Sequence, residues 1–243
     1  MTTSVMTHRL LTGAAPSTHR VGMPFEPDNR ERVGQTIQAP WSATGLVSAT
    51  FPTGFIAEAT GFVIGDRFVV TAAHAVYDKE HGGGVASQIT FEPARNATQL
   101  PYGPSLVSTW KFPTEYPSGG RLYDYCLLKL AKPLPSEVVH YQLTVASDEE
   151  LTRGEFQIAG YPDDKAPENS MWSGSGKLLN AGPRILRYKI STSGGQSGAA
   201  VATYLGVNQT KAVGIHVGVA PAKDANEAVR LTKNVVDQIN SWK

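Results

Sequence analysis

The sequence predicts an all-β protein built from short strands, with one helix at its C-terminal end. Its 243 residues include 24 Gly and 16 Pro, and so many turn formers favour short strands over long helices. Short runs rich in β-branched and aromatic residues recur between residues 46 and 216, as they do in barrels and sandwiches. An apolar fraction of 41% is enough for a chain of this length to bury a core.

The elements follow in a regular order. Residues 1–32 are polar and rich in Thr, Arg, Pro and Gly, which predicts an N-terminal arm or pro-segment. Strands are predicted at 46–50, 61–64, 68–71, 87–91, 106–110, 126–130, 156–159, 186–190, 198–202 and 212–216. Pro, Ser and acidic residues cluster over 133–152, and this composition predicts a break between two halves.

The C-terminal segment has a different pattern. Ala228, Leu231, Val235 and Ile239 recur near the 3.6-residue period of a helix. An amphipathic helix is therefore predicted over 226–243.

Charge and composition exclude several classes of partner. The chain has 22 Lys and Arg against 21 Asp and Glu and no dense basic run, so nucleic acid is not an expected partner. No apolar stretch approaches the roughly 20 residues that span a bilayer, so no membrane partner is expected. No His, Cys and Asp cluster has the spacing of zinc ligands, and neither a metal nor a cofactor is expected.

Cys126 is the single cysteine, so no intrachain disulfide is possible and packing must hold the fold. Residues 1–18 lack an apolar segment after a basic start, so no secretory signal is recognisable. The protein is expected to be cytoplasmic as written, or secreted if a signal precedes this sequence.

Three local patterns indicate catalysis. His74 follows a strand and two alanines, Asp124 opens an apolar strand, and Ser197 lies in a turn among Gly and Ala residues. A serine hydroxyl becomes a good nucleophile only when a base takes its proton, and His, with a pKa of about 6.5, suits that role. A carboxylate then fixes the tautomer of the His and stabilises the imidazolium. The order His, Asp, Ser is that of chymotrypsin and not of the α/β-hydrolases.

Glycines beside the serine allow backbone N–H groups to converge on an oxyanion. The N–H groups of Gly195 and Ser197 are the predicted donors.

These segments resemble those of trypsin- and chymotrypsin-like serine proteases. Residues 71–74, Thr-Ala-Ala-His, resemble that family's histidine signature, and 195–198, Gly-Gln-Ser-Gly, resemble its Gly-x-Ser-Gly. Asp124 and the leucines that follow are similar to the family's Asp-x-Ala-Leu-Leu segment, although Cys126 stands where Ala is usual. The resemblance covers most of residues 60–219.

The resemblance implies two antiparallel six-stranded β-barrels packed face to face, with the helix on the outside. His74 and Asp124 would come from the first barrel, and Ser197 and the specificity pocket from the second. In residue numbers, the protease domain would be 33–243, the first barrel about 41–135, the second about 150–222 and the helix about 226–243.

A narrower resemblance concerns specificity. Residues 213–218, Val-Gly-Ile-His-Val-Gly, are similar to a segment of the staphylococcal V8-like glutamyl endopeptidases. That resemblance implies that His216 and Thr192 receive a glutamate carboxylate. It also implies that cleavage after Arg20 would free an α-amino group on Val21, which would add positive charge to the pocket. Ser191 stands where proteases that cleave after Lys or Arg carry an acid.

Each residue also has a structural interpretation. His74 could be a core or surface histidine, Ser197 a turn residue, and Asp124 a cap at a strand edge. His216 could be a hydrogen-bonded histidine within a strand, and Thr192 could stabilise the turn. Cys126, inside an apolar run, is interpreted as a small buried residue and not as a nucleophile.

The sequence therefore predicts a serine endopeptidase that cleaves polypeptides after Glu, with Asp as the second choice. The alternative is a catalytically silent or partner-activated module with the same fold. An activating protease or a regulatory partner stays open as a further partner.

Overall fold

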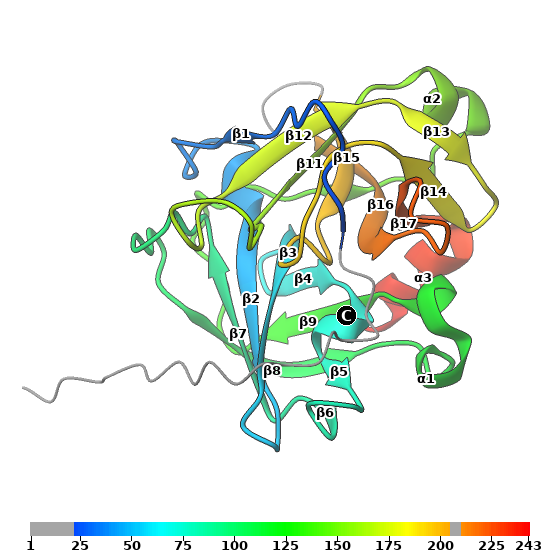
Figure 1. The fold of residues 1–243 in the computed structure, drawn as a ribbon. Coiled ribbons are helices and arrows are strands. Elements are labelled where there is room, and N and C mark those ends of the chain that lie inside the picture. Colours follow the sequence, from blue (N-terminus) through cyan, green and yellow to red (C-terminus); the bar gives the residue numbers. More distant parts are fainter. Residues whose placement is uncertain (1–21, 205–209) are drawn as a thin grey trace, which may run out of the picture.

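The computed structural model describes residues 22–204 and 210–243 (Figure 1). Two β-structures lie one above the other, the lower built from the N-terminal half of the chain and the upper from the C-terminal half. The described elements are β1 (Glu31–Arg32), β2 (Thr44–Thr50), β3 (Ile56–Gly65), β4 (Phe68–Thr71), β5 (Tyr77–Asp78), β6 (Gly84–Val85), β7 (Gln88–Pro93), β8 (Ser105–Lys111), α1 (Tyr116–Gly119), β9 (Cys126–Leu130), β10 (Gln142–Leu143), α2 (Asp148–Arg153), β11 (Phe156–Gly160), β12 (Trp172–Gly176), β13 (Leu178–Ala181), β14 (Ile185–Tyr188), β15 (Ala200–Tyr204), β16 (Thr210–Val219), β17 (Asn226–Arg230) and α3 (Lys233–Ser241). Single 3₁₀ turns cover Trp41–Ala43, Ala73–Ala75 and Gly120–Tyr123.

The lower half is a closed barrel in the strand order β2-β3-β4-β9-β8-β7. Successive side chains of a strand point to opposite faces, and β7 follows that rule because Ile89 and Phe91 are buried while their neighbours are partly exposed. The barrel interior is filled by large apolar side chains, among them Phe62 and Leu128, both fully buried. The closed barrel is therefore built from strands that lie between Thr44 and Leu130.

The upper half, in the described residues, is a nine-stranded sheet in the order β1-β12-β11-β15-β16-β17-β14-β13, with β10 added on β16. The all-β, chymotrypsin-like fold class is confirmed, but this half is a curled open sheet and not a closed six-stranded barrel. Strand β12 ends at Gly176 and β13 begins at Leu178, so Lys177 alone separates them. These two strands nevertheless lie near opposite ends of the strand order. The short strands β1 and β10 come from outside the predicted second half.

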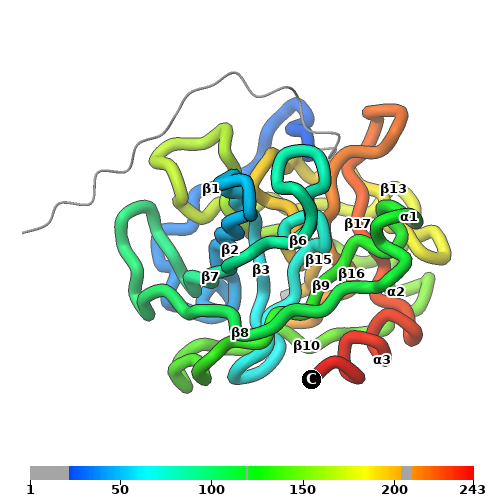
Figure 2. Tube along the Cα trace, turned by 90° about the horizontal axis from the view of Figure 1, so that it is seen from below, coloured from blue at the N-terminus to red at the C-terminus, as the bar shows by residue number. Residues whose placement is uncertain are grey.

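The two halves share apolar packing. One cluster of buried residues extends from Val47 and Phe62 of the first barrel to Ile215 and Leu231 of the second half. A smaller cluster joins Leu46 to Tyr161 and other residues of the upper sheet. Figure 2, which views the molecule from below, shows the C-terminal helix α3 at the outer edge of the molecule. Because the core is continuous, the groove between the halves has walls fixed by packing.

The C-terminal helix is shorter than the sequence predicts. Residues 226–230 form β17, which pairs with both β14 and β16, and α3 begins only at Lys233. The side chain of Thr232 caps α3 by accepting a hydrogen bond from the Val235 N–H. The apolar spacing of a buried strand followed by a helix imitates one long helix, which explains the wrong boundary. Among the described helices, none is long and apolar enough to cross a bilayer.

Residues 22–32, part of the segment assigned to an N-terminal arm, lie along the upper half. β1 pairs with β12 in the register Glu31 to Ser173. Closer to the chain start, the Met23 N–H donates to Asn226 Oδ1 at 2.9 Å, and the Asn226 amide donates to the Met23 carbonyl at 2.8 Å. This segment is therefore hydrogen-bonded to two strands of the upper sheet, β12 and β17.

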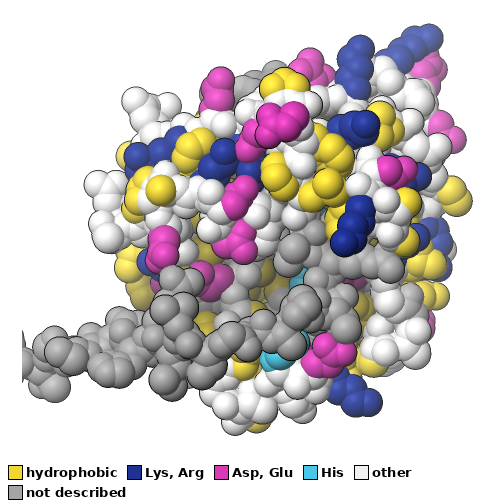
Figure 3. All heavy atoms as spheres, in the orientation of Figure 1, with side chains coloured by type: hydrophobic (Ala, Val, Ile, Leu, Met, Phe, Trp, Pro, Cys, Tyr) yellow, Lys and Arg dark blue, Asp and Glu magenta, His cyan; other side chains and the backbone are white. Residues whose placement is uncertain are grey.

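The face drawn in Figure 3 carries acidic and basic side chains interspersed with apolar ones.

Candidate active site

His74 lies where strand β4 ends. The short 3₁₀ turn Ala73–Ala75 follows the strand and carries it, and Ala72, Ala73 and Ala75 are all buried. Because these three positions are buried, small side chains allow the turn to pack closely on the core. The His74 side chain itself keeps 12% of its surface exposed, which leaves the ring open to the groove.

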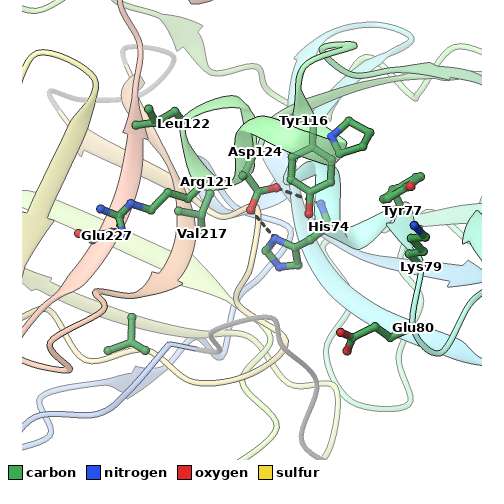
Figure 4. Close-up of a pocket in the computed structure, with 13 residues that line it drawn as sticks. His74, Tyr77, Lys79, Glu80, Tyr116, Arg121, Leu122, Asp124, Val217 and Glu227 are labelled. Carbon is green, nitrogen blue, oxygen red and sulfur yellow. Dashed lines mark hydrogen bonds and ion pairs between the residues drawn. The ribbon is translucent and has the colours of Figure 1, made fainter.

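Asp124 is placed beside His74 by the pairing of β4 with β9. Thr71 stands opposite Cys126 in that ladder, so Asp124, two residues earlier, reaches the turn after Thr71. Its Oδ2 lies 2.7 Å from His74 Nδ1, and its Oδ1 accepts the backbone N–H of His74 at 3.0 Å, as the dashed lines of Figure 4 show. Both carboxylate oxygens hold the same residue, so Nδ1 carries the hydrogen and Nε2 is left as an acceptor at the other edge of the ring.

The pKa of His74 is raised above its ordinary value of 6.5. Burial acts to lower this pKa, but the charge of Asp124 and its hydrogen bond outweigh that effect. The arrangement therefore stabilises the imidazolium that would form once His74 has taken a proton.

Ser197 follows a tight turn over residues 193–196. The Gln196 N–H donates to the Ser193 carbonyl at 3.3 Å, and Gly195 at the third position has φ +83°, as a type II turn requires. A Cβ on Gly195 would collide with the Tyr161 carbonyl oxygen. Only glycine suits this position, which explains the Gly-rich sequence before the serine.

The Ser197 turn lies against the segment that carries His74. A Cβ on Gly198, whose φ is +86°, would stand only 2.7 Å from the backbone N of Ala72 and would collide with Thr71. Thr60 of β3 connects the first barrel to the Ser197 turn. Its N–H donates to the Ser197 carbonyl and its hydroxyl to the Gly195 carbonyl, both at 2.8 Å. Sequence analysis does not single out Thr60, since no local pattern marks it.

The turn also directs two backbone N–H groups. The Gly194 carbonyl accepts the Asp163 N–H at 2.9 Å, and because the peptide is planar and trans, the Gly195 N–H points the opposite way. In the part of the chain that the structure describes, no residue accepts a hydrogen bond from the N–H of Gly195 or Ser197. Asp163 thus anchors the turn, and the Ser193 hydroxyl donates to its Oδ1 at 2.6 Å.

His216 and Thr192 meet at a buried site behind the turn. Both are 0% exposed, and β16 is joined to the serine segment because the Gly198 N–H donates to the His216 carbonyl at 2.8 Å. Within the described residues, His216 Nε2 and Thr192 Oγ1 have no hydrogen-bond partner, which is costly for buried polar atoms. The other ring nitrogen, Nδ1, lies 2.8 Å from the Tyr188 hydroxyl.

Burial lowers the pKa of His216 to about 3, so its imidazole is neutral at pH 7 when the site is empty of charge. Gly22 covers these two atoms, since a Cβ there would collide with Thr192 Oγ1 and stand 2.8 Å from His216 Nε2. Val21, the predicted source of an α-amino charge, lies outside the described residues.

A family model for the trypsin-like peptidase domain matches residues 59–214, which is more than half of the chain. The chain belongs to the trypsin-like peptidase family. Glutamyl endopeptidase of Bacillus licheniformis is 32% identical to this peptidase over 223 residues, which are 89% of this chain and 67% of that protein. A solved structure of a Glu endopeptidase in complex with MPD matches with a TM-score of 0.79 and 25% identity, covering 90% of this chain and 98% of that one.

A Bacillus subtilis protein named extracellular metalloprotease is also similar, with 32% identity over 220 residues that cover 88% of this chain and 68% of that protein. Among the described residues of this trypsin-like peptidase, no three His, Cys, Asp or Glu side chains are grouped to hold a metal ion.

The groove of the peptidase contains a cleft of about 640 Å³ beside His74 and Asp124. Tyr77 and Tyr116 form one wall and Val217 of β16 the other (Figure 4). Arg121 crosses the far end toward Glu227, with 3.2 Å between its Nε and a carboxylate oxygen. Val217 directly follows His216 on β16, so the strand that carries His216 also supplies this wall of the cleft.

Cys126 lies apart from this chemistry. It is fully buried on β9, and burial raises the pKa of its thiol. A thiol held in its neutral form is a poor nucleophile, in keeping with the interpretation of Cys126 as a packing residue.

Proposed function

We propose that this trypsin-like peptidase is a serine endopeptidase in which Ser197 is the nucleophile, His74 the general base and Asp124 the residue that orients His74. The observation that carries the proposal is the pair of hydrogen bonds that His74 donates to the two carboxylate oxygens of Asp124. It leaves Nε2 of His74 as a proton acceptor next to the segment against which the Ser197 turn is packed.

In the proposed mechanism, Ser197 Oγ attacks the peptide carbonyl carbon and its proton passes to His74 Nε2. The carbonyl oxygen becomes an oxyanion that accepts from the N–H groups of Gly195 and Ser197, and each donor of this kind is worth about 100- to 1000-fold in rate. The C–N bond then breaks as His74 returns the proton to the leaving amine. In the second half of the reaction, water attacks the acyl carbon while His74 takes one of its protons. The bond to Ser197 Oγ then breaks, and His74 returns the proton to that oxygen.

We further propose that the peptidase cleaves after glutamate, with aspartate as the second choice. Thr192 Oγ1 and His216 Nε2 are buried polar atoms without a partner among the described residues, and a substrate carboxylate would give both of them one. Its charge would also raise the pKa of His216 from about 3 and favour a hydrogen on Nε2. The names of the B. licheniformis relative and of the matched Glu endopeptidase structure support this specificity.

Removing the Thr192 hydroxyl tests the specificity. Thr192→Val is expected to lower kcat/KM about 10- to 100-fold for a peptide with Glu before the cut, because a charge-assisted hydrogen bond is worth about 1.5–3 kcal/mol. The same peptide with Gln should lose much less. Steady-state rates on the two peptides measure the difference.

Thr152→Val is the matched control, since Thr152 is exposed on α2 and should leave both rates unchanged. Equal losses for the Glu and Gln peptides would contradict a role for Thr192 in binding a carboxylate. Mass spectrometry of the products from a mixed peptide pool tests activity and specificity together. Cleavage after Lys or Leu as often as after Glu would refute the specificity.

The rival function is a protease-fold module that binds a partner without cutting it. A fluorophosphonate probe separates the two, because it labels only a serine that is activated as a nucleophile. Labelling at Ser197 in the wild-type chain supports the enzyme. Comparing the full chain with one that begins at Val21 tests whether processing is needed, since only the shorter chain would carry the freed α-amino group.

A further inference from the structure

We propose that Arg30 is a positioning residue that holds the Ser197 turn in the shape required for an oxyanion site. The proposal rests on the proposed serine protease function. It gives the N-terminal segment 22–32 a catalytic consequence, although Arg30 touches no reacting atom.

Arg30 is an arginine whose side chain is fully buried. Its side chain is 0% exposed, and its guanidinium faces two carboxylates. Nε and one terminal nitrogen donate to Asp28 at 2.9 and 2.7 Å. Both terminal nitrogens donate to Asp164, at 2.9 and 2.6 Å. Two such paired interactions use the planar fork in a way that lysine does not reproduce.

A first path leads from Arg30 to the turn through Gln196. A terminal nitrogen of Arg30 donates to Gln196 Oε1 at 3.3 Å, and the same oxygen accepts the Ser193 N–H at 3.0 Å. Gln196 is fully buried and directly precedes Ser197. Arg30 thus fixes the oxygen atom that joins the two ends of the turn 193–196.

A second path runs through the loop after β11. Arg30 holds Asp164, and Asp163 is the residue directly before it. The Asp163 N–H donates a hydrogen bond to the Gly194 carbonyl at 2.9 Å. That bond sets the direction of the Gly195 N–H, since the two groups belong to one trans peptide. The guanidinium therefore supports the oxyanion donor by a second route that does not pass through Gln196.

The electrostatics favour a positioning role over a purely stabilising one. The Arg30 guanidinium holds the pKa of Asp28 well below its usual range. Buried ion pairs commonly contribute little net stability, because desolvation offsets attraction, but loss of one partner leaves uncompensated charge. Lys165 stands 2.9 Å from Asp28 and would still compensate that carboxylate in a variant, whereas Gln196 would lose its contact to the N-terminal segment.

The experiment compares Arg30→Met, Arg30→Lys and the control Arg32→Met. Arg32 lies two residues away on β1, is exposed, and donates to Asn96 Oδ1 at 3.1 Å. We expect Arg30→Met to lower kcat about 100-fold, the size of a lost oxyanion donor, with KM nearly unchanged. The kcat of Arg30→Lys should lie between those of Arg30→Met and the wild type, and the kcat of Arg32→Met should equal that of the wild type.

Rates are measured well below each variant's melting temperature, on protein whose near-UV circular dichroism is native, so that a merely structural role would leave kcat unchanged. The rate of fluorophosphonate labelling at Ser197 should fall with kcat. A folded Arg30→Met or, if that variant does not fold, Arg30→Lys with wild-type kcat and labelling rate would overturn the proposal.

Failure of the proposed function gives a different result, because the wild-type chain would then neither cleave peptides nor react with the probe. In that case, amide hydrogen exchange over residues 193–198 is the readout. Faster exchange in Arg30→Met than in Arg32→Met supports the positioning role. Equal exchange in the two variants refutes it.

Discussion

Ser197→Ala is expected to lower kcat about 10⁶-fold while leaving the fold intact. The hydroxyl oxygen is the atom that would bond to the substrate carbon, and no other group in the site replaces it. The structural bonds of this residue come from its backbone, since the Ser197 carbonyl accepts the Thr60 N–H at 2.8 Å. Alanine keeps that bond. Peptide hydrolysis, probe labelling and the melting temperature are the three measurements.

Ser136→Ala is a suitable control, because Ser136 is exposed and its hydroxyl contacts only the adjacent Glu137 among the described residues. It should retain full activity. A Ser197→Ala variant that cleaves peptides at the wild-type rate would leave the proposed mechanism without its nucleophile. A variant that is inactive and also unfolded would not meet the prediction, because its fold is expected to survive.

Patterns within single strands allowed most of the first barrel to be predicted. The runs 68–71 and 126–130 are rich in Val and Leu and form β4 and β9 with the same bounds. β12 could not be predicted in this way, because its sequence Trp-Ser-Gly-Ser-Gly has low strand propensity. Its pairing with β11 and β1 is imposed by tertiary structure.

In the candidate site too, some residues can be predicted from local sequence and others only from the fold. His74 and Asp124 stand in recognisable local sequences, and the structure brings Asp124 Oδ2 within 2.7 Å of His74 Nδ1. The residues that support the site, such as Thr60 and Arg30, act on segments more than 130 positions away. A buried polar residue with a distant partner leaves no periodic signal in sequence, so only the fold reveals its role.

Asp124→Asn is expected to lower kcat about 10⁴-fold and to move the acid limb of the pH profile to lower pH. An amide has one oxygen, and the backbone N–H of His74, which now donates to Asp124 Oδ1, would claim it. The NH₂ group would then face Nδ1 and force the hydrogen of the ring onto Nε2, where it blocks proton transfer from Ser197.

The pH shift has a definite sign. Activity requires neutral His74, so it is lost as the pH falls through the pKa of His74, which lies above 6.5 in the wild type. Burial acts to lower that pKa, and the charge of Asp124 is the main effect that opposes it. Without the carboxylate, burial prevails and the residual activity persists to lower pH. The profile of kcat/KM against pH measures the limb, with the exposed Asp237→Asn on α3 as control. An acid limb at the wild-type pH would mean that Asp124 does not govern the titration of His74, and the double hydrogen bond between them would then have no catalytic role.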